Sequence, residues 1–239
     1  MVAVAMAARE AVAEAAVALS HLGLVTGFGH VSARIGASML ITPASDLGIA
    51  TEATIIEVPL DASALPPGAP AEAWAHLALY RTRPDASAVA RAQPPSAFAV
   101  AAAADVLRPM HGQAAWLGAS VPVHHDARPL RTPELALRAA ERLPTGEALL
   151  LRGNGGLTLG ETPGIAVTRM WLLAAACDVW LATRGAVAVT ELRPEEILAW
   201  RAVQDELLTR LWRHLLGRSL GSAVPPGATS DDTWEDGPA

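Results

Sequence analysis

The sequence predicts an α/β domain, in which helices and short strands alternate along the chain and pack in layers. Segments with apolar residues at helical spacing alternate with short apolar segments, and glycine or proline separates most of them. With 239 residues, 51% of them hydrophobic, the chain is long enough for one large domain with a substantial core. We therefore expect one domain over residues 1–220. From residue 221 to 239, prolines, glycine, serine and an acidic cluster predict a disordered tail.

In the first half of the chain we expect three helices and four strands. In order they are a helix at residues 2–22, strands at 31–34, 39–42 and 54–60, a helix at 71–81, a strand at 86–93 and a helix at 95–104. The first helix is rich in alanine and ends where Gly23 begins a glycine-rich segment. Glycine and proline bound the strands, and a proline-rich loop precedes the second helix. Pro94 ends the fourth strand, and Pro95 suits the first turn of the helix that follows.

The second half of the chain continues the alternation. In order we expect a strand at residues 121–125, a helix at 133–142, strands at 148–152 and 157–159, and helices at 163–184 and 194–216. A tight Gly-Asn-Gly-Gly turn at 153–156 separates the last two strands and contains Asn154. The penultimate helix is apolar along its length. The last one is amphipathic, with Trp200 and Trp212 among its apolar positions.

The composition argues against nucleic acid and membrane partners. The net charge is −6, the pI is near 5.6, and no basic stripe is present, so the electrostatic footprint of a nucleic-acid-binding protein is missing. Charges at Arg9, Glu10 and Glu14 interrupt the apolar N-terminal run, so we expect neither a signal peptide nor a membrane helix there. The expected partner is a small molecule.

Two residue counts bear on location and chemistry. Cys177 is the only cysteine and lies in an apolar run, which excludes an intrachain disulfide and predicts an inert buried thiol in a cytoplasmic protein. All 18 basic residues are arginines, so the chain has no lysine. Schiff-base catalysis by a lysine amine is therefore excluded.

Five motifs follow one another in a fixed order. They are Gly29-His30-Val31-Ser32-Ala33-Arg34, then Leu40-Ile41-Thr42-Pro43, then Glu72 with His76 and Tyr80, then Arg83-Pro84-Asp85 with Arg91-Ala92-Gln93-Pro94, and lastly residues 150–160. In this order and spacing the chain resembles the class II aldolase/adducin family, with its fuculose-phosphate-aldolase-like fold, over residues 1 to about 215. The resemblance implies a three-layer α/β/α sandwich around a central, mostly antiparallel sheet. It also implies a homotetramer with active sites at the subunit contacts.

The resemblance further implies a metal site that this chain has changed. In the family, a His-x-His-Pro pattern and an Asn-His-Gly turn supply three metal-binding imidazoles, and a Glu before the middle helix acts as acid or base. The matching residues here are Arg91, Gln93 and Asn154, with Glu72 retained. A guanidinium has no lone pair and repels cations, so we expect no catalytic metal and no other cofactor.

Arg91 keeps a positive charge roughly where the metal would be. Its planar fork can bind a carboxylate or enolate oxygen, and Gln93 and Asn154 would add amide donors to the same site. Arg91 and Gln93 lie two residues apart on the expected strand and so should point the same way. In the alternative, Arg91 pairs only with Glu72 in a buried salt bridge that preserves the fold after catalysis was lost.

The substrate is expected to be carboxylated rather than phosphorylated. Phosphosugar aldolases of the family bind phosphate through hydroxyl and glycine residues. The matching segments here are His30-Val31-Ser32, Ala44-Ser45 and Pro70-Ala71, which lack most of that cradle. The first motif is similar to a branch of the family that includes decarboxylases of hydroxylated aromatic or pyridine carboxylic acids. We therefore expect a carbon–carbon lyase, of decarboxylase or retro-aldolase type, that acts on an aromatic or otherwise apolar carboxylate through an enolate-like intermediate.

The residues assigned to this chemistry fall into two groups. The catalytic candidates are Glu72, Arg91 and His30, and the substrate-binding candidates are Ser32, Arg34, Gln93, Asn154, His125 and His111. The sequence does not choose the proton carrier among the three histidines of this set. A relocated metal site at His30, His111, His124 or His125 ranks lower, because their spacing matches no ligand motif.

Two other functions stay open at this point. The same site would also suit a cyclase, dehydratase or isomerase of a specialised metabolite, because those reactions use the same enolate chemistry. The chain would alternatively be a non-catalytic binding protein like the adducin branch of the family. Substitution of Arg91 or Glu72 separates an enzyme from a scaffold.

Overall fold

The short apolar segments pair into one eight-stranded mixed sheet in the computed structural model, which describes residues 2–25, 27–219 and 221. The strands are β1 (His30–Ile35), β2 (Ser38–Ile41), β3 (Ile56–Pro59), β4 (Ala88–Ala92), β5 (Val106–Leu107), β6 (Val121–His124), β7 (Ala148–Leu151) and β8 (Gly155–Gly160). Their order is β3-β2-β1-β4-β8-β7-β6-β5. Among these eight strands of the described residues, β6 and β7 alone pair in parallel, which confirms the expected mostly antiparallel sheet.

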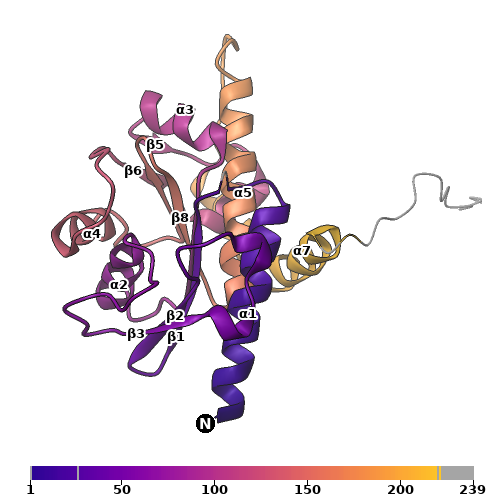
Figure 1. The fold of residues 1–239 in the computed structure, drawn as a ribbon. Coiled ribbons are helices and arrows are strands. Elements are labelled where there is room, and N and C mark those ends of the chain that lie inside the picture. Colours follow the sequence, from indigo (N-terminus) through magenta and orange to yellow (C-terminus); the bar gives the residue numbers. More distant parts are fainter. Residues whose placement is uncertain (1, 26, 220, 222–239) are drawn as a thin grey trace, which may run out of the picture.

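Helices cover both faces of the sheet (Figure 1). They are α1 (Val2–His21), α2 (Ala73–Thr82), α3 (Pro95–Ala103), α4 (Pro133–Ala140), α5 (Pro163–Ala182), α6 (Pro194–Arg201) and α7 (Gln204–Ser219), with short 3₁₀ segments η1 (Leu47–Ile49), η2 (Glu52–Thr54) and η3 (Gly112–Leu117). Helices α2 and α4 pack on one face, and α1, α3, α5 and α7 contribute to the core on the other. The fold is therefore the expected three-layer sandwich.

The alternation of side chains along β4 separates the two cores. Ala88, Ala90 and Ala92 belong to the core under α5, whereas Val89 belongs to the core under α2 and α4. Arg91 thus lies on the α2 and α4 face. On β1, Val31 packs in the α5 core, so His30 also lies on the α2 and α4 face. The strand register pairs His30 with Arg91.

The predicted single helix at 194–216 is wrong, because the chain forms α6 and α7 with a break at residues 202 and 203. The two helices pack against different elements. Helix α6 contacts η3, where the Trp116 indole donates a hydrogen bond to the carbonyl of Trp200 at 2.9 Å. Helix α7 contacts α5, where Trp212 lies over Gly164. Segments β5, η1, η2 and η3 were also not predicted. Apart from Gly221, the predicted tail lies outside the described residues.

Helix α5 is long and apolar enough to cross a membrane by length and composition alone. In this fold it is the central core helix, and 56% of its most apolar 18-residue stretch is buried within the protein. A helix that is hydrophobic all round is typical of such a buried position. Cys177 lies on this helix and is buried, as predicted. Burial, and to a smaller extent the negative charge of the nearby Asp178, raises the pKa of its thiol to about 12.

Candidate active site

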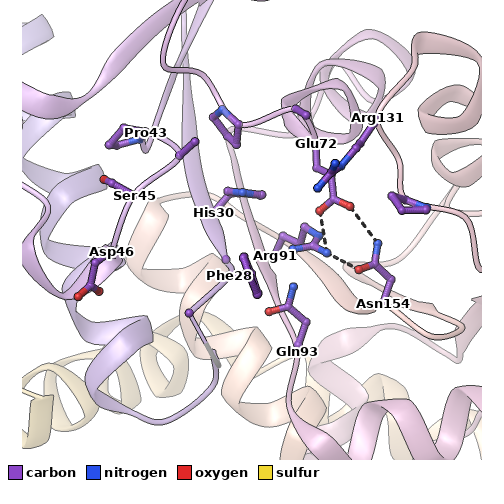
Figure 2. Close-up of a pocket in the computed structure, with 16 residues that line it drawn as sticks. Phe28, His30, Pro43, Ser45, Asp46, Glu72, Arg91, Gln93, Arg131 and Asn154 are labelled. Atoms are coloured by element: carbon purple, nitrogen blue, oxygen red, sulfur yellow. Dashed lines mark hydrogen bonds and ion pairs between the residues drawn. The ribbon is translucent and has the colours of Figure 1, made fainter.

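A cavity of about 560 Å³ lies where the ends of β1 and β4 meet the start of α2 (Figure 2). It is lined by residues 27–30 and 43–46, by residues 70–72, by Arg91 and Gln93, and by Pro129, Arg131 and Asn154. Loops before β1, after β2, before α2 and before α4 thus converge on the end of β4. Five of the predicted site residues line this cavity, namely Glu72, Arg91, His30, Gln93 and Asn154.

Glu72 and Arg91 form an ion pair at the floor of the cavity. Arg91 Nη2 lies 2.7 Å from Glu72 Oε2, and the two side chains are 2% and 12% exposed. Glu72 occupies the position just before the first residue of α2, one residue outside the helix in which we expected it. Burial lowers the pKa of the Arg91 guanidinium, the Glu72 carboxylate opposes that shift, and Arg131 adds to it. The salt bridge that the alternative interpretation expected is therefore present, and Arg91 also bonds to Asn154.

Asn154 bridges the two charges. Its Oδ1 accepts a hydrogen bond from Arg91 Nη2, and its Nδ2 donates to Glu72 Oε1 at 3.3 Å (Figure 2). The turn reaches this position because Gly155 follows with a φ of 80°, and a Cβ there would lie 2.1 Å from the Ala92 carbonyl oxygen. Only glycine allows the β7–β8 turn to approach the end of β4 this closely.

Gln93 completes the surroundings of the guanidinium. With its amide oxygen turned toward Arg91, it accepts from Nη1 at 2.5 Å and from Nη2 at 3.0 Å, while its amide nitrogen donates to the Phe28 carbonyl. Gln93 and Asn154 therefore both present oxygen atoms to Arg91. Their amide groups orient the guanidinium, which is the reverse of the donor role that we expected toward a substrate.

His30 is a buried, neutral imidazole at the edge of the cavity. Burial lowers its pKa well below the usual histidine value, and His76 and Arg91 lower it further. Its Nδ1 has no hydrogen-bond partner among the described residues, and its ring meets that of His76 edge-on with centroids 5.9 Å apart. The neutral ring can accept or donate one hydrogen bond toward the cavity.

Ser32 lies behind His30 and does not line the cavity. Its hydroxyl is hydrogen bonded to His76 Nδ1 at 2.7 Å and to the Tyr80 hydroxyl at 2.8 Å. Burial, with Arg91 as a second cause, lowers the pKa of His76 to about 3, so this ring is neutral. The three polar groups support the α2 and β1 packing behind the site.

Three of the predicted binding residues lie away from the cavity. Arg34 donates to the backbone carbonyls of Ala86, Tyr80 and Arg83 and stacks 5.0 Å from the Tyr80 ring centroid. His125 is exposed, with its Nε2 3.1 Å from Asp105. His111 precedes η3 and is half-buried, which lowers its pKa. None of the three lines the cavity that holds Glu72 and Arg91.

Phe28 and Arg131 are among the lining residues that were not predicted. Phe28 is 72% exposed on the glycine-rich loop before β1, and Arg131 is exposed on the loop before α4. The flanking residues Gly27 and Gly29 marked the first loop as a turn without indicating its partner. Arg131 immediately precedes the helix cap Thr132, and nothing in the sequence places that cap beside Glu72.

The residues present do not fit a divalent metal. The guanidinium of Arg91 offers no lone pair to a metal ion, and the side-chain oxygens of Asn154 and Gln93 accept hydrogen bonds from it. Across the part of the chain that the structure describes, no group of three or more His, Cys, Asp or Glu side chains could hold a metal ion. Glu72 remains as the carboxylate of the site.

The chain belongs to the class II aldolase/adducin family: residues 10–181 match the family described as Class II Aldolase and Adducin N-terminal domain. It is 36% identical over 166 residues to the 3,4-dihydroxyphthalate decarboxylase of Arthrobacter keyseri. The match covers 62% of this chain and 67% of that protein. The enzyme of the same name from Rhodococcus jostii (strain RHA1) is 31% identical to this chain, and the match covers 62% of this chain and 68% of that protein.

The fold is similar to that of a solved aldolase. The L-fuculose-1-phosphate aldolase of Thermus thermophilus superposes with a TM-score of 0.67 at 31% identity, and the match covers 74% of this chain and 96% of that one. The matching family and the named relatives together support carbon–carbon lyase activity.

Proposed function

We propose that this protein is a metal-independent carbon–carbon lyase that removes CO₂ from a hydroxylated aromatic carboxylate. The observation that supports the proposal is the hydrogen-bonded cluster of Glu72, Arg91 and Asn154, which borders the cavity. Two relatives are named for decarboxylation of 3,4-dihydroxyphthalate, a hydroxylated aromatic carboxylate. Retro-aldol cleavage makes the same demand on the site, since either reaction passes through an enolate-like anion.

Glu72 is the proton carrier of the proposed reaction. Glu72, as a carboxylate, first accepts the proton of the substrate hydroxyl next to the reacting carbon. The phenolate oxygen then pushes an electron pair onto the ring, and the ring carbon that bears the carboxylate takes the proton from Glu72. The bond to the carboxylate breaks last, its electron pair restores the aromatic ring, and CO₂ leaves. Of the two carboxyl groups that line the cavity, Glu72 lies beside Arg91 and Asn154, whereas Asp46 lies on the far side of His30.

Arg91 acts mainly through Glu72 and through its charge. Its side chain is almost fully buried, and its Nη2 is already bonded to Glu72 and Asn154. It therefore holds the carboxylate in one orientation, and its positive charge is uncompensated whenever Glu72 carries a proton, which favours a developing anion in the cavity at that moment. His30 is placed to hydrogen bond a substrate hydroxyl as a neutral ring.

The experiment is CO₂ release from 3,4-dihydroxyphthalate by untagged protein, with metal content measured by elemental mass spectrometry and a chelator challenge. We expect activity that survives the chelator, and loss of activity of at least about 100-fold in Glu72→Gln. Glu147→Gln is the matched control, because Glu147 also pairs with an arginine, Arg201, at 2.9 Å but lies outside the cavity. Activity that requires stoichiometric metal, or full activity in Glu72→Gln, would refute the proposal.

A non-catalytic binding protein is the second candidate, and the near-complete burial of Arg91 favours it. A scaffold would fold and bind its partner with Glu72 neutralised, whereas the lyase would lose turnover. A cyclase, dehydratase or isomerase with the same site would consume a substrate without releasing CO₂, so product analysis separates it from the lyase.

We further propose that the protein is a cytoplasmic homotetramer with one domain over residues 1–220. The lone buried thiol of Cys177 suits a reducing compartment. The tetramer is expected from kinship with the family, and light scattering after size-exclusion chromatography tests it.

A further inference from the structure

Arg131 is a cation without a counter-ion at the edge of the cavity. Within residues 2–25, 27–219 and 221, its guanidinium makes no ion pair and no hydrogen bond, although it lines the cavity. The other cavity arginine, Arg91, is bonded to Glu72 and Asn154. Of the two guanidinium groups, Arg131 is thus the one with all of its donors available to a ligand.

The backbone on both sides of Arg131 is fixed. Leu130 is buried in the core beneath α2 and α4. Thr132 caps α4 by accepting a hydrogen bond from the Leu135 backbone N–H, and the backbone N–H of Arg131 donates to the Pro129 carbonyl at 2.8 Å. The side chain therefore projects from an anchored position rather than from a loose loop tip.

The neighbouring arginines show a different arrangement. Asp126 accepts from Arg128 Nε at 2.9 Å and lies 2.5 Å from its Nη2, and Arg138 Nη2 lies 3.9 Å from the same carboxylate. The carboxylate of Asp126, five residues before Arg131 on the same loop, is thus already paired with two other arginines. Arg131 alone among these three lines the cavity.

The charges of the cavity are unevenly distributed. Glu72 and Arg91 offset each other as an ion pair. In Figure 2, Arg131 lies on the side of Glu72 and Asn154, whereas Asp46 lies on the far side of His30. Asp46 also accepts a hydrogen bond from the Gly48 backbone N–H at 2.9 Å, which binds it to its own loop. The end of the cavity beside the proton carrier is consequently the positive end.

We propose that Arg131 binds a carboxylate that the substrate keeps through the reaction, so that the substrate carries two carboxylates. This inference rests on the proposed function. The group that leaves as CO₂ loses its charge in the transition state, so a cation on it would stabilise the ground state and slow the reaction. A cation that holds the other carboxylate stabilises both states equally and fixes the ring beside Glu72. The planar guanidinium fork suits bidentate binding of that carboxylate.

The test uses ligands with and without the retained carboxylate. 3,4-Dihydroxybenzoate has the single carboxylate that remains after loss of CO₂, and catechol has none. Titration calorimetry should show that the wild-type protein binds 3,4-dihydroxybenzoate roughly 10- to 100-fold more tightly than catechol, as expected for charge-assisted hydrogen bonds. Arg131→Gln should abolish that preference and leave catechol binding unchanged.

Arg128→Gln is the matched control, because it removes an exposed arginine from the same loop without touching the cavity. It should keep the preference for 3,4-dihydroxybenzoate. If both variants lose the preference equally, or if neither loses it, the inference is overturned. With 3,4-dihydroxyphthalate as substrate, Arg131→Gln should raise KM by roughly 10-fold or more and change kcat much less.

The binding measurement does not depend on turnover. If the Arg131-dependent preference is found but no CO₂ is ever released, the proposed function fails and the carboxylate site stands. If CO₂ is released and Arg131→Gln leaves both KM and the binding preference unchanged, the proposed function stands and the carboxylate site fails.

Discussion

The ion pair of Glu72 and Arg91 makes a measurable prediction about the stability of the fold. Removal of one partner from a fully buried pair costs about 3–5 kcal/mol, because the other charge is left without compensation. Here Arg91 is 2% exposed and Glu72 is 12% exposed, so the carboxylate can relax toward the cavity when Arg91 is removed. We therefore expect Arg91→Met and Glu72→Gln each to lower the free energy of unfolding by about 2–4 kcal/mol.

The two substitutions should be non-additive. In the double variant neither charge is left alone, so the loss should be smaller than the sum of the single losses by about 1–3 kcal/mol. Urea unfolding measures the free energy of unfolding of the wild type, the two single variants and the double variant. All four are measured at one protein concentration, so that any contribution from subunit association is the same for each. Additivity within about 0.5 kcal/mol would show that the two groups do not interact as the structure indicates.

The pair of Arg201 and Glu147 provides the control cycle. Its side chains are 29% and 18% exposed, and it lies outside the cavity. Water screens this pair more strongly, so its coupling energy should not exceed about 1 kcal/mol. A larger coupling at Arg201 than at Arg91 would contradict the reasoning from burial.

Three further predictions concern the metal, pH and the cavity rim. Joint substitution of Arg91, Gln93 and Asn154 by histidine should create a site that holds about one Zn²⁺ per chain by elemental analysis, whereas the wild-type chain should hold none there. The pKa of His76 is about 3 in the folded protein, which is below its value of about 6.5 in the unfolded chain, so the folded state loses stability as the pH falls below about 6.5. By pH 5, urea unfolding should show that His76 has lowered the free energy of unfolding by about 2 kcal/mol. This loss should be absent in His76→Gln. Phe28→Ala should weaken catechol binding several-fold by calorimetry, because it removes an exposed aromatic face from the cavity rim.

The layered fold was readable from the sequence because it depends on local patterns. Glycine and proline mark the ends of most elements, and the apolar segments between them have lengths typical of strands or helices. The exception is informative. Residues 194–216 have one continuous helical pattern, yet the chain breaks after α6, because α6 packs on η3 and α7 packs on α5. The positions of those partners are tertiary information.

The site was predicted in part for the same reason. The sequence motifs predicted that Glu72, Arg91, Gln93 and Asn154 belong to one site, and the structure brings these four residues together at one cavity. Their roles were not readable, because the direction of the Gln93 and Asn154 amides depends on contacts across the turn and the strand end. Arg34 was expected at the substrate, but it donates to backbone carbonyls around Tyr80.

The sequence by itself thus determined the type of fold and the absence of lysine chemistry, since each depends on which residues occur and in what order. Only the tertiary structure decided that Arg91 is buried against Glu72, and that Arg131, 40 residues after Arg91 in the chain, reaches the same cavity. Burial and charge pairing arise from packing between segments that are distant in sequence. A local pattern contains no information on which of two arginines will be neutralised and which will be left to bind a ligand.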